Sequence, residues 1–188
     1  MKKKRILPVL LSLVLIINMF PSFALALDTD TNGVYQISTA QDLAEFRDMV
    51  NSGSTSIRAV MLKDIDLGGS EENQWTPIGT EINPFNGSFD GGGFEITGLY
   101  INSTDSEYQG LFGYIGKSGT VANLGVSGEV TVTGGGYIVG GVAGENDGTI
   151  ENCYNTGDVT GDIQVGGVAG WNDGTIENCY NTGDVTGN

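Results

Sequence analysis

The feature that most constrains this chain is an internal repeat near its C-terminus. Residues 140–161 return as residues 166–187 after a step of 26 residues, and the only difference is Glu145 in the first copy against Trp171 in the second. A fixed period of this length is typical of proteins that stack one supersecondary unit on its own copy. The repeat therefore predicts a solenoid, in which each unit contacts mainly its neighbours.

A third and more divergent copy precedes the two good ones, at about residues 110–131. Its blocks are Gly110-Leu-Phe-Gly113, Gly119-Thr-Val-Ala-Asn-Leu124 and Gly128-Glu-Val130, and the first two blocks are separated by two more residues than in the later copies. When the three copies are aligned, like residues fall into four apolar columns. The columns are Val121/Ile150/Ile176, Leu124/Cys153/Cys179, Val130/Val159/Val185 and Leu111/Val142/Val168.

Four apolar columns on short segments, separated by Gly, Asn and Asp, require a closed interior. A strand rises about 3.3 Å per residue and neighbouring strands lie about 4.8 Å apart. A unit of 26 residues with three strand-sized blocks thus has the length of one coil of a parallel β-helix. Antiparallel hairpins with the same turns are the alternative, but they lose the stacking of like residues. The sequence predicts an all-β fold, a parallel β-helix.

The segment before the repeats is expected to cover one end of this stack. Thr39-Ala-Gln-Asp42 resembles a capping box with Asp in the last position, and it predicts a helix to about Asn51 whose apolar residues lie on one face. We expect an N-terminal cap and lead-in coils over 27–105 and repeats over 106–188. Since the chain stops at the end of a repeat, we also expect the array to be truncated at its C-terminus.

The first 26 residues have the pattern of a secretory signal peptide. Four basic residues at 2–5 precede the apolar run Ile6–Phe20, and Ala24-Leu25-Ala26 fits a cleavage site. An uncleaved membrane anchor is the alternative, but the run is short for a span of about 20 apolar residues. We therefore expect a secreted or cell-surface protein with no membrane span once the signal is cleaved.

The remaining chain is strongly acidic. Without residues 1–26, four basic residues face 23 acidic ones, a net charge of −19. Such a surface repels nucleic acid and anionic lipid, so nucleic-acid binding is excluded as a function.

The glycine blocks resemble a known bacterial repeat. Gly110-Leu-Phe-Gly113, Gly141-Val-Ala-Gly144 and Gly167-Val-Ala-Gly170, each followed by Gly-Thr-(Val/Ile)-x-Asn, look like the GLUG motif of bacterial surface proteins, and residues 85–99 resemble its lead-in coil. The resemblance implies a right-handed β-helix in secreted or wall-associated proteins, including adhesin-like proteins and the N-terminal regions of zinc peptidases that cut immunoglobulin A. No catalytic residue carries over, because those peptidases need a His-Glu-x-x-His site and this chain has no histidine.

Two sets of repeated residues are predicted to be structural. Asn123, Asn152 and Asn178 occupy one position of three coils and are expected to form a hydrogen-bonded ladder, with ligand contact as the alternative. Cys153 and Cys179 share a column with a leucine, which favours buried thiols. A disulfide stays open, because export permits oxidation although the parallel Cβ directions suit a bridge poorly.

Two further sets are expected to face solvent. Glu151, Asp158, Glu177 and Asp184 form outward acidic columns, for which adventitious calcium is a weak hypothesis beside a solvated face. The outward aromatics Tyr154, Trp171 and Tyr180 offer a ligand platform, with shielding of the sheet as the alternative.

These residues favour an interaction module over an enzyme. We predict adhesion, or a spacer role, with no catalytic residue, no cofactor and no metal other than the weak calcium candidate. The expected partner is an extracellular protein or glycan, and further repeats or a C-terminal anchor are expected beyond this segment. The alternatives are an Asp-based polysaccharide hydrolase, or the non-catalytic N-terminal part of a larger surface peptidase.

Overall fold

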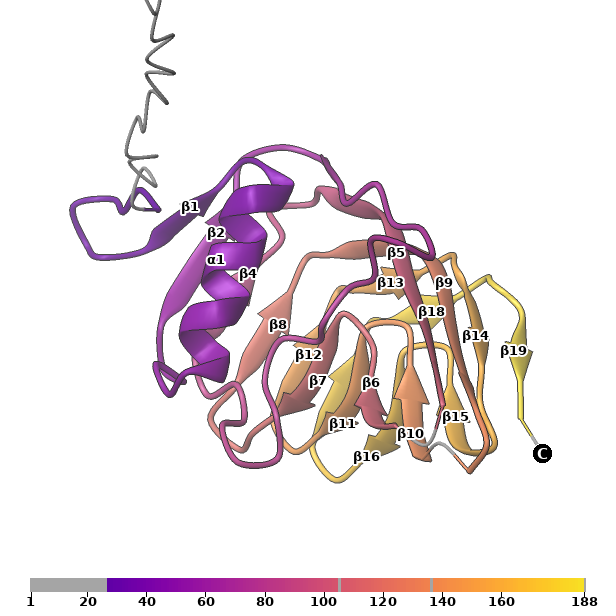
Figure 1. Cartoon of the computed structure of the whole chain (residues 1–188). Helices are drawn as coiled ribbons and strands as arrows, with labels where there is room; N and C mark the ends of the chain where they lie inside the picture. Colours follow the sequence, from indigo (N-terminus) through magenta and orange to yellow (C-terminus); the bar gives the residue numbers. More distant parts are fainter. Residues whose placement is uncertain (1–26, 105, 136, 188) are drawn as a thin grey trace, which may run out of the picture.

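The computed structural model describes residues 27–104, 106–135 and 137–187, and the predicted signal peptide lies outside these residues. The chain winds into a parallel β-solenoid of about four turns with one short helix near its N-terminus (Figure 1). The expected β-helical architecture is thereby confirmed. No helix within the described ranges has the length and apolar character needed to cross a membrane.

Four parallel sheets form the sides of the solenoid, and each is named here by one of its strands. The β12 sheet contains, in spatial order, β1 (Tyr35–Ile37), β2 (Arg58–Met61), β4 (Ser88–Asp90), β8 (Thr120–Ala122), β12 (Thr149–Glu151) and β17 (Thr175–Glu177). The β10 sheet contains β6 (Glu107–Gln109), β10 (Tyr137–Gly140) and β15 (Ile163–Gly166). The β11 sheet contains β7 (Phe112–Ile115), β11 (Ala143–Asn146) and β16 (Ala169–Asn172). The β14 sheet contains β3 (Ile65–Asp66), β5 (Glu95–Thr104), β9 (Gly125–Thr133), β13 (Tyr154–Asn155), β14 (Asp158–Thr160), β18 (Tyr180–Asn181) and β19 (Val185–Thr186).

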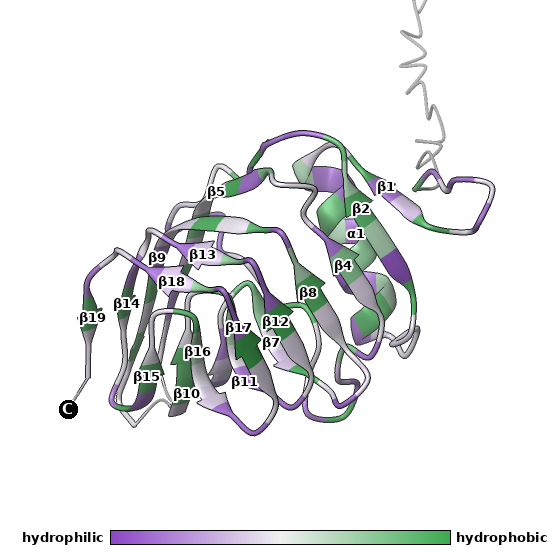
Figure 2. Cartoon of the chain, turned by 180° about the vertical axis from the view of Figure 1, so that it is seen from behind, coloured by the Kyte–Doolittle hydropathy of each residue, from purple (hydrophilic) through white to green (hydrophobic). Residues whose placement is uncertain are grey.

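The repeat pairs with itself in register. Ile150 lies between Val121 and Ile176, and the same alignment places Val159 between Val130 and Val185. Ile150 and Val159 are buried, whereas Ile176 and Val185 are 37% and 44% exposed. The last two belong to the final coil, on which no further coil lies in the part of the chain that the structure describes. Hydrophobic segments are visible there in β17 and β19 (Figure 2).

Helix α1 (Ala40–Asn51) lies at the N-terminal end of the stack, beside β1 and β2 (Figure 1). The predicted capping box is present, with the Thr39 hydroxyl accepting from the Asp42 amide and the Asp42 carboxylate accepting from the Thr39 amide. Leu43, Phe46 and Val50 are fully buried. The Phe46 ring packs against those of Phe85 and Phe89, with centroids 5.9 and 5.8 Å apart. The helix therefore caps the apolar interior, as the sequence predicts.

Two details of the strand pattern differ from the expectation. In the sequence, residues 58–67 read as one strand-like run, but in the structure they are divided into β2 and β3, which belong to different sheets. A full coil also has more than three strand-sized blocks, because β10 precedes the glycine block and forms a sheet of its own. The chain turns from one sheet to the next between β10 and β11, at a corner that contains Gly140 and Gly141.

The corner glycines leave no room for side chains. A Cβ added to Gly140 would lie 2.0 Å from the carbonyl oxygen of Ala143. A Cβ added to Gly144 would lie 2.7 Å from the Cα of Tyr108 in the neighbouring coil. Both separations are far below van der Waals contact, so Gly140 and Gly144 are required for packing where the β10 and β11 sheets meet.

Candidate functional site

The interior of the solenoid contains asparagines that the sequence reasoning missed. Asn146 and Asn155 are 0% and 2% exposed, respectively. The Asn146 amide donates to the Asn172 side-chain oxygen at 2.7 Å, and the Asn155 amide donates to the Asn181 oxygen at 2.8 Å. Each pair links equivalent positions of successive coils, so these ladders are structural. The Asn155 amide is bonded through both its nitrogen and its oxygen, whereas the buried Asn146 oxygen has no hydrogen-bond partner among the described residues. The recurrence of Asn at both positions was the available signal.

The predicted asparagine ladder lies at a surface turn. Asn123, Asn152 and Asn178 all adopt the left-handed conformation, with φ of 54°, 53° and 54°, which asparagine tolerates better than most residues. The Asn152 amide donates to Asn123 at 3.3 Å, and the Asn123 amide donates to the Asp90 carboxylate at 3.0 Å. The position therefore combines a turn conformation with bonds between coils.

The two cysteines are free thiols in the structure. Cys153 is fully buried in its apolar column, and its Sγ lies 3.2 Å from the carbonyl oxygen of Glu151. The Cys179 sulfur accepts a hydrogen bond from the Cys153 amide at 3.3 Å. Burial raises the pKa of the Cys153 thiol to about 12, so this thiol is a poor nucleophile and a poor metal ligand.

The acidic residues stack on successive coils, as expected, without converging on one point. Glu151 and Glu177 are register partners in the β12 sheet, while Asp158 pairs with Glu129 in the β14 sheet. The Asp158 carboxylate also accepts from the Asp184 amide at 3.0 Å. Within residues 27–104, 106–135 and 137–187, no group of three or more His, Cys, Asp or Glu residues is placed to hold a metal ion. Calcium binding at these columns stays a prediction.

The aromatic residues lie on two different faces. The rings of Tyr154 and Tyr180 are stacked, 5.3 Å apart and inclined by 9°. The Tyr154 ring covers Gly125, where an added Cβ would lie 2.3 Å from it. Trp171, by contrast, belongs to β16 in the β11 sheet. The structure therefore does not bring Trp171 together with the tyrosines, and the expected three-residue platform is wrong in this respect.

A second aromatic cluster lies on the β11 side. Trp171, Glu145 and Tyr114 are register partners on three successive coils. The Tyr114 ring stacks on that of Tyr108, with centroids 5.6 Å apart and an inclination of 19°. Neither tyrosine was singled out from the sequence, because the pairing joins two strands of the divergent coil and is absent from the two good copies.

The geometry defines the chain as a repeat-built parallel β-solenoid with acidic and aromatic side chains in outward columns. Residues 135–160 and 161–186 match the family model described as the GLUG motif, so these two coils are GLUG repeats and the expected resemblance is confirmed for them. Each family match starts five residues before the corresponding repeat as defined in the sequence analysis, at 135 against 140 and at 161 against 166. In a solenoid, where each coil runs into the next, the starting point is a matter of convention.

Two curated relatives share this sequence pattern. A protein of Evansella cellulosilytica, described as a Gly-rich membrane protein, is 41% identical over 125 residues, which are 63% of this chain and 14% of that protein. Halomucin of Haloquadratum walsbyi is 34% identical over 136 residues, which are 68% of this chain and 1% of that protein. The chain thus spans only a small part of the length of both relatives.

One solved structure has a similar fold. A crystal structure described as that of an immunoglobulin A1 protease from Bacteroides ovatus superimposes with a TM-score of 0.59 and 22% identity, covering 84% of this chain and 59% of that one. At this identity the likeness supports the fold and carries no information about activity.

Proposed function

We propose that this chain is a non-catalytic interaction module or spacer of a secreted or cell-surface protein. The observation that carries the proposal is the repetition of outward side chains in register: Glu151 with Glu177, Asp158 with Asp184 and Tyr154 with Tyr180. A catalytic site needs different groups with tuned pKa values that converge in one pocket. Identical coils instead present the same group many times along a strip.

The relatives' names support a surface location. One relative is described as a membrane protein and the other as a halomucin, and the predicted signal peptide is consistent with export. The partner we propose is an extracellular protein or glycan that is itself repetitive. Weak contacts repeated along such a polymer raise the overall affinity through effective concentration. In a larger surface peptidase the same module would serve as a non-catalytic N-terminal part.

The experiment changes the number of coils. Duplicating residues 140–165 adds one GLUG coil, and deleting them removes one, without disturbing the register of the remaining repeat. We expect retention on immobilised mucin, pectin or purified cell-wall polysaccharide to rise with each added coil. A matched series that carries Tyr154→Ala and Tyr180→Ala, and the same change in each inserted coil, keeps the length and removes the aromatic strip. Equal retention for all coil numbers would refute the interaction role.

An Asp-based polysaccharide hydrolase is the competing function. The same substrates are therefore also assayed for release of reducing ends. We expect none. Turnover that disappears in Asp158→Asn or Asp184→Asn would overturn the proposal and place the protein among the enzymes.

A further inference from the structure

A hollow beside Tyr108 differs from the repeated strips because its aromatic side chain is not repeated on the next two coils. Its volume is about 220 Å³. Its lining residues come from the loop between β3 and β4 and from strand β6: Thr76, Pro77, Gly79, Thr80, Glu81, Glu107, Tyr108 and Gln109. The residues that match Tyr108 on the next two coils are Ile138 and Gln164, so the aromatic wall belongs to the divergent coil alone.

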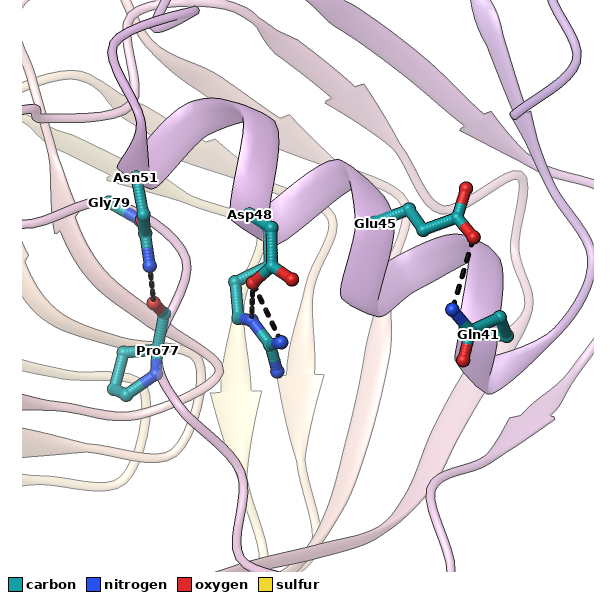
Figure 3. A network of polar contacts seen from close by, with 7 residues as sticks. Gln41, Glu45, Asp48, Asn51, Pro77 and Gly79 are labelled. Carbon is teal, nitrogen blue, oxygen red and sulfur yellow. Dashed lines mark hydrogen bonds and ion pairs between the residues drawn. The ribbon is translucent and has the colours of Figure 1, made fainter. Parts of the chain in front are cut away.

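The loop that contributes Pro77 and Gly79 to the lining is held in place by the end of helix α1. The Asn51 side chain donates to the Pro77 carbonyl at 3.0 Å and accepts from the Gly79 amide at 2.8 Å. Figure 3 shows Asn51 at the end of the helix, reaching toward Pro77 and Gly79. The same loop is fixed to the solenoid by Ile78, whose amide donates to the Leu111 carbonyl at 3.0 Å. The hollow is therefore formed before any ligand arrives, which lowers the entropic cost of binding.

The surroundings of the hollow are acidic. Glu81 and Glu107 line it directly, and no Lys or Arg is among the lining residues. Burial raises the pKa of Tyr108, and the charges of Glu81, Glu145 and Glu107 raise it further. Beyond the stacked Tyr114, whose hydroxyl donates to the Asp147 carboxylate at 3.2 Å, lies the side chain of Glu145. Burial raises the pKa of Glu145, and the charges of Asp147, Asp173 and Glu81 raise it as well. The described lining of the hollow thus carries two carboxylates and no basic side chain.

From this arrangement we propose that the hollow beside Tyr108 binds an alkylammonium group, the cationic end of a lysine side chain or of a free diamine. The face of a tyrosine ring attracts such a cation, and carboxylates at the rim accept its hydrogen bonds. Bare calcium fits less well, because it takes six to eight oxygens at about 2.3–2.6 Å, and the described acids nowhere converge in groups of three or more.

Calorimetric titration with trilysine peptide and with 1,5-diaminopentane tests the proposal. We expect saturable binding at one site per chain. Tyr108→Gln, which introduces the residue found at the equivalent position 164, and Glu81→Gln should each weaken binding by about fivefold or more. The matched controls are Tyr180→Gln and Glu129→Gln, which make the same chemical changes on the β14 sheet and should alter binding less than about twofold.

The outcomes are distinct. Equal weakening by Glu81→Gln and Glu129→Gln would show a diffuse charge effect and overturn the proposal, as would the absence of saturable binding. If Tyr108→Gln impairs folding, the comparison of Glu81→Gln with Glu129→Gln still tests whether binding depends on the hollow. Binding of both probes would identify a free amine as sufficient, and binding of trilysine alone would identify a lysine peptide. Because the added coils have no tyrosine at the position of Tyr108, the stoichiometry should stay at one when coils are added, which separates this site from the repeat-dependent binding proposed above.

Discussion

The buried amide of Asn155 gives the sharpest test of how the solenoid interior is held together. Its side-chain nitrogen donates to the Gly157 carbonyl at 2.7 Å, and its oxygen accepts from the Gly157 amide at 3.2 Å. A third bond, at 2.8 Å, joins it to Asn181 in the next coil. Asn155→Ala therefore removes three hydrogen bonds and leaves both backbone groups of Gly157 without these partners in a buried turn.

The expected cost follows from these bonds. A typical hydrogen bond contributes about 1 kcal/mol net, and a buried group left unsatisfied costs about 1–3 kcal/mol. For three bonds we expect Asn155→Ala to lower the free energy of unfolding by about 3 kcal/mol. In a chain of this size, that corresponds to a fall in the melting temperature of about 6–12 °C.

Urea unfolding followed by far-UV circular dichroism and by tryptophan fluorescence measures this difference. The matched control is Asn181→Ala in the last coil, where the equivalent bond to the Gly183 carbonyl, at 2.7 Å, is only partly buried. Asn181→Ala also removes the bond that Asn181 accepts from Asn155 at 2.8 Å. Water can replace the Gly183 bond, so the control loses mainly this one shared bond and should cost only about 1 kcal/mol. Equal losses in the two variants, or a loss below about 1 kcal/mol for Asn155→Ala, would refute the structural role assigned to the inward ladder.

Three further predictions test other parts of the structure. In thiol titration, native protein should show one accessible thiol, that of Cys179. The Cys153 thiol should react only after denaturation, because burial raises its pKa to about 12. Finding no reactive thiol in denaturant, together with a mass lower by two hydrogens, would instead establish a disulfide. Gly144→Ala should cost about 3 kcal/mol or more in thermal unfolding, because its Cβ would meet the Tyr108 backbone at 2.7 Å, and a loss within about 0.5 kcal/mol would contradict the packing argument. Burial and neighbouring acids raise the pKa of Glu145 in the folded protein, so ionisation of this carboxyl opposes folding. Glu145→Gln should therefore increase the free energy of unfolding at neutral pH. The gain should vanish below about pH 4, where the carboxyl is protonated in both the folded and the unfolded state. A gain of equal size at both pH values would contradict the electrostatic explanation.

The repeat made the architecture predictable because it limits how the units can pack. Identical units can place like residues side by side only by parallel stacking in register, which the pairing of Ile150 with Val121 and Ile176 bears out. Helix α1 was predictable because a local capping signal and an apolar face coincide at 39–51. Strand β10 was not, because Tyr137–Gly140 precedes the glycine block and carries no alternation that marks a separate sheet.

The side-chain sites were less predictable, for a different physical reason. Sequence alignment places residues in columns but does not say which side of the coil a column faces. Asn146 begins an Asn-Asp-Gly segment, which predicts an exposed turn, yet its amide is buried and bonded to the next coil. Trp171 was grouped with Tyr154 and Tyr180 because all three are outward aromatics of the repeat, but β17 and the bends on either side of it separate β16 from β18 and place Trp171 on another sheet. The Tyr108–Tyr114 stack depends on contact across the glycine corner between β6 and β7, which no residue spacing reveals.

The two good copies differ only at position 145, where Glu145 corresponds to Trp171. The glycines are fixed by backbone contacts, the valines and isoleucines by the core, and the asparagines by turns and inward ladders. Position 145 is free of these constraints, because its side chain lies on the outer face of the β11 sheet, in register with Tyr114 on one side and Trp171 on the other. A match to the glycine motif therefore identifies the fold, whereas an outward position such as 145 can change without disturbing it.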